Sequence, residues 1–239
     1  MKKFLKLTTV VVSMVMALTF VSCANGNTSN NGNENSNENT SNNGNENSNE
    51  EELNLVGTYG ISKIEDIYKN PKSEASFTMT MPTSTSLRQY GTQKVIDGET
   101  TTVIEMDATV TKTADGYSFN WAKYDIDGVA QDDEAKAEQE TQFGDNQWNG
   151  FTAMFAMTIT TNADGTWSDN NTPSSSGTYT VDEENSKVII KTLMEGEETL
   201  QDPKIMKATY SNNGKTLVVV LENSYNEETG KTTMTLTRK

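Results

Sequence analysis

The residue types able to do chemistry in this 239-residue chain are few. There is one cysteine, Cys23, and no histidine, while Asp and Glu total 34. Without histidine the chain lacks His/Cys zinc sites and Ser-His-Asp or Cys-His catalytic sets, and a single cysteine forms no disulfide within it. The formal net charge of −15 argues against nucleic acid as a partner, because phosphate binding needs clustered Lys and Arg.

Two acidic turns contain the residue types of a calcium loop, Asn162–Gly165 and Asp125–Gly128. An EF-hand needs oxygen ligands at positions 1, 3 and 5, Gly at position 6 and Glu at position 12. The first turn has Asn171 at position 12, and the second has Lys123 at position 1. Both turns therefore fail the pattern, and we interpret them as hairpin turns.

Paired carboxylates could also serve as the acid and base of glycoside hydrolysis. The segment 53–239 holds 28 Asp and Glu, so some of them must lie close together by chance. The sequence has no Gly-x-Ser-x-Gly nucleophile elbow and no phosphate-binding loop. We therefore expect a protein that is not an enzyme and that needs no cofactor and no metal.

The context of Cys23 gives its thiol a different role. Three lysines within the first six residues precede the mostly apolar stretch 7–21, which carries no charge. That stretch is short for a membrane span, which needs about 20 apolar residues, and suits a signal peptide. Phe20-Val21-Ser22-Cys23 resembles the lipobox of bacterial lipoproteins, with Phe20 where that family usually has Leu.

The resemblance implies that residues 1–22 are a lipoprotein signal peptide, removed as Cys23 is lipidated. Several acyl chains would then anchor the protein durably in a membrane. Ala24 is not the Asp associated with inner-membrane retention in some bacteria, which favours the outer membrane. The alternative is an ordinary signal peptide that is cleaved near Ala24.

Residues 23–52 are predicted to be a disordered tether behind the lipidated Cys23. Between residues 24 and 52 there are 13 Asn, six Glu and no aliphatic side chain larger than Ala. The eleven residues TSNNGNENSNE occur at 28–38 and again at 40–50. A repeat without an apolar face has nothing to bury against its neighbour, so we expect no folded structure.

Residues 53–239 are long enough for one domain with a sizeable core. Runs of alternating apolar and polar residues indicate about ten half-buried antiparallel strands. The longest run spans 151–159 and predicts a strand, and only 130–141 looks helical, where the lack of an apolar stripe fits either a short surface helix or a solvated loop. Five Asp-Gly or Asn-Gly pairs are typical of tight hairpin turns and begin at Asp97, Asp115, Asp127, Asp164 and Asn213.

The order of short motifs in 151–239 is similar to that of small lipocalin-like domains of bacterial lipoproteins. They are TITTNADGTW at 158–167, SGTYTV at 176–181, KVII at 187–190, YSNNGKTL at 210–217 and TMTLTR at 233–238. Gly57-Thr58-Tyr59 resembles the Gly-x-Trp opening of the lipocalin barrel. The resemblance implies an all-β, antiparallel up-and-down barrel over 53–239, and 61–150 is long enough to add strands or a lid.

Two non-catalytic functions remain open at this point. Small barrels can hold one apolar ligand, and flexible Met side chains suit such a pocket. The residues expected to line it are Phe77, Met79, Met81, Met106, Phe119, Trp121, Phe155 and Met157. The same side chains could instead form a packed core, and the protein would then display its outer surface to a macromolecular partner.

Overall fold

The computed structural model describes residues 53–239 except 172–174, 194–203 and 226. The predictions for the signal peptide, for Cys23 and for the tether concern residues 1–52 and lie outside the described part of the chain. The described segment that begins at Leu53 forms one unit by its internal contacts.

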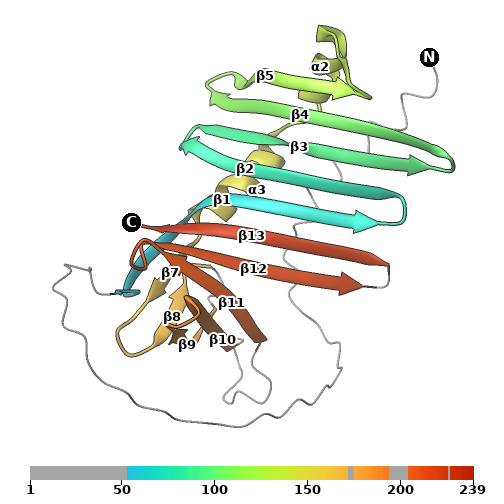
Figure 1. Cartoon of the computed structure of the whole chain (residues 1–239). Coiled ribbons are helices and arrows are strands. Elements are labelled where there is room, and N and C mark those ends of the chain that lie inside the picture. Colours follow the sequence, from blue (N-terminus) through green and yellow to red (C-terminus); the bar gives the residue numbers. More distant parts are fainter. Residues whose placement is uncertain (1–52, 172–174, 194–203, 226) are drawn as a thin grey trace, which may run out of the picture. The chain divides into compact units, whose positions relative to one another are not determined.

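That unit consists mostly of antiparallel strands, joined in chain order by short turns (Figure 1). The strands are β1 Gly57–Asn70, β2 Ser73–Thr83, β3 Ser86–Asp97, β4 Thr100–Thr113, β5 Gly116–Ile126, β6 Val129–Ala130, β7 Thr158–Thr161, β8 Thr166–Asp169, β9 Ser176–Asp182, β10 Lys187–Leu193, β11 Lys204–Ser211, β12 Thr216–Tyr225 and β13 Glu228–Arg238. The helices are α2 Asp133–Glu140 and α3 Asp145–Ala156.

Eight of the strands close into an antiparallel barrel, called the ring from here on. Its order is β1-β7-β8-β9-β10-β11-β12-β13, and β13 pairs with β1 to close it. All neighbours are antiparallel and, apart from the pairs β1–β7 and β13–β1, consecutive in the chain. The predicted all-β, up-and-down, lipocalin-like architecture is confirmed at this level.

The strands β2 to β6 continue the sheet outside the ring, and we call them the sheet extension. The branching strand is β1, which pairs with β7 over Gly57–Gly60 and with β2 over Lys63–Asn70. The order then runs β2-β3-β4-β5-β6 as a meander of hairpins. The segment between the first and second ring strands was expected to add strands or a lid, and it adds both strands and helices. All five Asp-Gly or Asn-Gly pairs lie at hairpin turns, as predicted.

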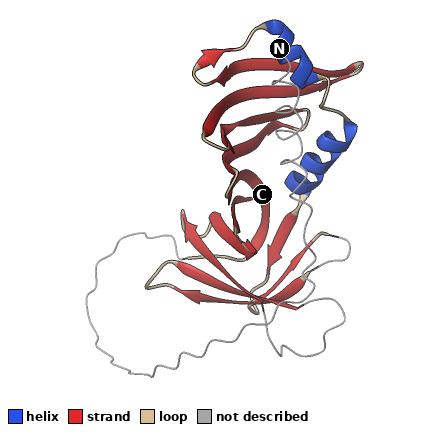
Figure 2. Cartoon of the chain, turned by 90° about the vertical axis from the view of Figure 1, so that its right-hand side faces the viewer, coloured by secondary structure: helices blue, strands red, loops and turns tan. Residues whose placement is uncertain are grey.

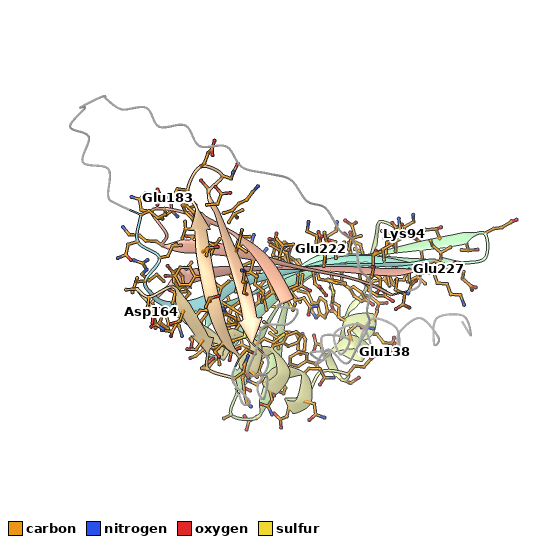
Figure 3. The ribbon with its side chains drawn as sticks, turned by 90° about the horizontal axis from the view of Figure 1, so that it is seen from below. Lys94, Glu138, Asp164, Glu183, Glu222 and Glu227 are labelled. Atoms are coloured by element: carbon orange, nitrogen blue, oxygen red, sulfur yellow. The ribbon has the colours of Figure 1, made fainter. Side chains whose placement is uncertain are left out.

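The two faces of the sheet extension differ in chemistry. Register places Met79, Ile104, Ala108 and Val110 on one face, and all four are buried. Both helices lie on this side, so we call it the covered face (Figure 2). The opposite, open face carries threonines and ion-paired Lys, Arg, Glu and Asp side chains. Figure 3 shows Lys94 on one side of the sheet and Glu138 of α2 on the other.

The prediction of a strand over 151–159 is wrong, because residues 145–156 form α3. The alternating apolar pattern there also fits a helix, since Trp148, Phe151 and Phe155 recur at i, i+3 and i+7. The start signal is a Gly144 N-cap whose N–H donates to Gln147 Oε1 at 3.1 Å. Met157 ends the helix, and β7 begins at the next residue. The short helix predicted within 130–141 is confirmed as α2.

Large side chains fill the ring where its first and last strands meet. Tyr59 and Leu236 are 0% exposed, and Val219 is 2% exposed. The Tyr59 hydroxyl donates to the carbonyl of Gly214 at 2.6 Å and accepts from Arg238 Nη2 at 3.0 Å. The Arg238 guanidinium also lies 5.5 Å from the centre of the Tyr59 ring, within cation–π range. This network ties the start of β1 to the end of β13.

A glycine allows the Trp167 ring to pack inside the barrel. Gly177 of β9 pairs with Trp167 of β8, and the indole Nε1 donates to the carbonyl of Lys191 at 3.1 Å. A Cβ at Gly177 would overlap that carbonyl oxygen and would lie 3.0 Å from Nε1. A larger residue here must therefore displace the backbone of β10, and with it the carbonyl to which the Trp167 indole donates.

Gly177→Ala should therefore lower the free energy of unfolding by about 1–3 kcal/mol, the usual cost of overpacking. Urea unfolding followed by circular dichroism measures this difference. The matched control is Gly150→Ala in α3, where a Cβ meets nothing within 4 Å. That change should raise the stability by about 0.5–1 kcal/mol, as expected for Gly to Ala in an exposed helix. Equal stability of the two variants would contradict the packing described for Trp167.

Candidate functional site

The structure separates most of the predicted ligand-binding residues from the ring. Phe77, Met79 and Met81 lie on β2, and Met106 lies on β4. Phe119 and Trp121 lie on β5, Phe155 lies on α3, and Met157 is the C-cap of α3. The prediction of a place inside the barrel is therefore wrong for the six residues on β2, β4 and β5, since these strands lie outside the eight closed strands.

Sequence periodicity could not reveal this displacement, because the covered face continues the inner face of the ring. Ile61 pairs with Leu236 within the ring, and Ile64 pairs with Met234 and with Met79. A bulge at Ser62 shifts the register, so Ile61 and Ile64 both remain buried on the same side. For β2, β4 and β5, alternation correctly predicted which residues share a face, but not that these strands lie outside the ring.

Helix α3 covers part of this face with its apolar side. Trp148 and Phe151 are its two buried residues, and Phe155 follows one turn later on the same side. The helix contacts β1, the strand shared by the ring and the extension (Figure 2). The predicted residues of α3 thus lie on the covered face together with those of β2, β4 and β5.

An aromatic cluster joins β5 to the segment between the two helices. Phe143 packs edge-on against Tyr117 and Phe119, with ring centres 5.0 Å and 5.5 Å apart. Tyr117 also lies 5.7 Å from Trp148, and Phe119 stacks on Trp121 at 5.9 Å. Sequence reasoning missed Phe143 and Trp148 because neither belongs to an alternating run. The helical spacing of Trp148, Phe151 and Phe155 was the signal that could have identified this layer.

Polar contacts hold the helices on the sheet at the edge of this cluster. The Tyr117 hydroxyl donates to Asp145 Oδ1 at 2.5 Å, and Lys112 Nζ lies 3.4 Å from the same atom. The Trp121 Nε1–H donates to Glu140 Oε1 at 2.8 Å. Burial, and then the hydrogen bond to Asp145, raise the pKa of Tyr117 to about 12. The hydrogen bond from Tyr117, followed by Lys112, lowers the pKa of Asp145.

One carboxyl group lies on the covered face among apolar neighbours. Asp66 pairs with Phe77 on one side and with Thr232 on the other. Burial raises the pKa of Asp66, and the Thr232 hydroxyl opposes this by donating to Oδ1 at 2.7 Å.

The side chains of the eight predicted residues differ in how accessible they are to solvent. Met79 is 2% exposed and Met157 is 8% exposed, so these two are buried. The other six are all of intermediate exposure, although they lie on the apolar side of the sheet. These six side chains leave partly accessible apolar surface on the side of the sheet where the helices lie. The covered face is therefore the candidate functional site.

Charged side chains on the open face form ion pairs with one another. Arg88 and Asp107 form a two-bond ion pair at 3.0 Å and 2.8 Å across β3 and β4. Hydrogen bonding to Arg88 lowers the pKa of Asp107. Arg88 also lies 4.9 Å from the ring centre of Tyr90, which is 38% exposed. Exposed pairs of this kind contribute little stability and keep the face soluble.

No protein-family model, no curated protein and no solved structure matches the chain. Within the described ranges, no three His, Cys, Asp or Glu side chains are grouped so as to hold a metal ion. The helices in those ranges are too short and too polar to cross a membrane.

Asp145→Asn should lower the pKa of Tyr117 from about 12 toward its ordinary value, because burial alone then keeps it raised. Below the unfolded pKa of about 10 the neutral, hydrogen-bonded Tyr117 stabilises the fold, and this contribution disappears as the pH rises through about 12. NMR titration of ¹³C-labelled tyrosine rings measures the shift, and Tyr117→Phe assigns the signal. An unchanged pKa in Asp145→Asn would show that Asp145 does not face the hydroxyl.

Proposed function

We propose that this protein is a non-catalytic lipoprotein of the bacterial cell envelope, anchored through Cys23, whose β-domain binds a small apolar molecule on the covered face. The domain would be held at the membrane by acyl chains on Cys23 and by the segment 24–52. The outer membrane is the favoured location. Removal of the signal peptide would change the formal charge from −15 to −18, since it contains three lysines and no acid.

One observation carries the ligand proposal: six of the eight predicted Met and aromatic residues are partly accessible on one apolar face. A ligand there would have the sheet on one side and α3 on the other. Met81 and Met106 can adjust their side chains to ligands of irregular shape, since Met is flexible and polarizable. Pockets for apolar ligands are lined by such side chains together with a few polar groups, and Asp66 supplies one here.

The ring is the less favourable place for the same ligand. Tyr59, Leu236, Val219 and Val188 are between 0% and 3% exposed, as in a packed core. Trp167 adds another large side chain and is 5% exposed. Admitting a ligand there would require several of these side chains to move, whereas the covered face already has accessible apolar surface.

The second candidate function is display of the open face to a macromolecular partner. The specific observation in its favour is the pair of exposed apolar side chains on that face, Ile67 at 49% and Tyr90 at 38%. The surrounding ion pairs would give an association that weakens as salt increases. The apolar ligand remains the first proposal, because six Met and aromatic side chains are partly accessible on the covered face, against the two exposed apolar side chains named for the open face.

Cys23→Ser should move the protein from the membrane pellet to the soluble envelope or culture fraction. The reason is that the variant has no thiol to acylate. Mass spectrometry of the wild-type N-terminal peptide should show acyl chains on Cys23. The matched control is Ser22→Ala, which keeps a small residue before the cysteine. Membrane retention of Cys23→Ser, with an unacylated wild-type peptide, would contradict the anchor while leaving the ligand proposal standing.

The positions of the three tryptophans allow a direct test of where an apolar ligand binds. Trp121 and Trp148 lie between the sheet and the helices, whereas Trp167 lies inside the ring. A dibrominated fatty acid quenches indole fluorescence only by close contact. We expect it to quench the Trp167→Phe variant strongly, because that variant keeps both tryptophans of the covered face.

The matched control is the double variant Trp121→Phe, Trp148→Phe, in which only Trp167 fluoresces and little quenching is expected. The full chain with Cys23→Ser, dispersed in detergent and diluted into buffer, suffices for both. Quenching confined to Trp167 would place the ligand in the ring and refute the covered face. No saturable quenching in either variant would refute the lipophile proposal and favour the open face.

A further inference from the structure

The outer edge of β5 is a strand edge with little to cover it. On one side β5 pairs with β4 along its length. On the other side, within the described residues, its only strand partner is the two-residue β6, which pairs with Asp125 and Ile126. The Gln131 N–H donates to the Tyr124 carbonyl at 2.8 Å, so residues 116–123 form the outer edge of the sheet extension, at the upper end of the sheet in Figure 1.

The register shows which backbone groups point outward from this edge. The two-residue turn between β4 and β5 makes Thr113 and Gly116 a hydrogen-bonded pair, and such pairs alternate along an antiparallel ladder. Tyr117, Phe119 and Trp121 therefore occupy the non-hydrogen-bonded positions relative to β4. Each directs its backbone N–H and C=O away from β4, in the plane of the sheet. Their side chains at the same time lie in the aromatic cluster.

The side chains of this edge lack the usual protection against pairing. Edge strands are normally protected by charges, by proline or by burial. The run Gly116–Ala122 (GYSFNWA) contains no charge and no proline, and its open-face residues Ser118, Asn120 and Ala122 are exposed. The first cation is Lys123, which is engaged by Glu105 at 2.9 Å. The bulge beside Ala122 and the short β6 limit the free edge to about this run.

We propose that β5 pairs antiparallel with β5 of a second copy of this chain, with Phe119 on the two-fold axis. Phe119 would then face Phe119 of the other copy, and Tyr117 would face Trp121. These three pairs place all outward N–H and C=O groups in register, giving six main-chain hydrogen bonds. On the open face Ser118 would lie opposite Asn120, so no like charges meet despite the net charge of −15.

The strand is self-complementary in three respects that a different partner would have to reproduce. Aromatic pairs would align on the covered face, where cross-strand aromatic contacts are favourable. Small polar residues would align on the open face. The two-fold axis would place the helices of both copies on the same side of a continuous sheet, as a closed isologous dimer requires. This proposal does not depend on the lipid anchor or on the ligand.

A pairwise cross-link tests both the dimer and its register. Ser118 and Asn120 of different copies would form a non-hydrogen-bonded pair, with Cα atoms about 4.5 Å apart, within the range of a disulfide. We would make Ser118→Cys and Asn120→Cys separately in the full chain carrying Cys23→Ser, in detergent. An oxidised mixture should contain a disulfide-linked dimer of one chain of each kind, and each variant alone should remain largely uncross-linked.

The double variant Ser118→Lys, Asn120→Lys should weaken dimerisation in sedimentation velocity. In the proposed register each introduced lysine would lie opposite an introduced lysine of the other copy. Because like charges directly opposite are unfavourable, the dissociation constant should rise by about tenfold. The control is Ser76→Lys, Thr92→Lys, which adds the same charge at an exposed open-face pair of the inner strands β2 and β3. It should leave the dissociation constant nearly unchanged.

Three outcomes would overturn the proposal. The first is a monomer at all accessible concentrations with no cross-link in the mixture, although both thiols react with a soluble reagent. The second is efficient cross-linking of either variant alone, which requires another register. The third is equal weakening by the two lysine variants, which would mean that the charge acts from a distance and that the β5 edge is not the interface.

Discussion

The fold depends on one strand that belongs to two structures. The backbone of β1 pairs with β13 along most of its length, with β7 over its first residues and with β2 over its last. A strand has only two edges. One edge of β1 pairs with β13, and the other is divided between β7, which pairs with its first residues and closes the ring, and β2, which pairs with its last residues and begins the sheet extension. The bulge at Ser62 makes the transition and keeps Ile61 and Ile64 on the same face. The positions of β2 to β6 outside the ring follow from this sharing of β1.

The branch also explains why the two faces of the extension differ so strongly. Because the covered face continues the barrel interior, its strands keep apolar residues at alternate positions even outside the ring. The ring closes over its own apolar side, but the extension cannot, so α2 and α3 are needed as a second layer. Their aromatic residues and the contacts of Asp145 and Glu140 hold them there. The partial cover that results is the physical basis for the proposed ligand site.

An extension without closure also has an end. Barrels remove strand edges by pairing the first strand with the last, whereas a meander that leaves the ring must stop at an edge strand. That strand is β5. Its outward main-chain groups are the direct consequence of building on one side of β1, and the uncharged sequence around Phe119 leaves them available for a partner.

Much of the local structure could be read from the residues alone. Alternation identified β2, β4 and β5 of the extension and the residues on their apolar face, and the Asp-Gly and Asn-Gly pairs marked the hairpins. The exception was 151–159, where Phe151, Ala153 and Phe155 fit both a strand and a helix. The capping contact between Gly144 and Gln147 decides that case, and it depends on atoms outside the alternating run.

Outside 151–159, the sequence by itself determined that the domain is built of strands, which residues of β2, β4 and β5 are on the apolar face, and the absence of histidine chemistry, because these follow from composition and from a period of two residues. Only the tertiary structure decided that Phe77, Met79 and Met106 lie outside the ring. The choice between β2 and β7 as the neighbour of β1 is a long-range pairing, and the alternating pattern of a strand is the same whichever neighbour it has. The position of the candidate site depends on that choice.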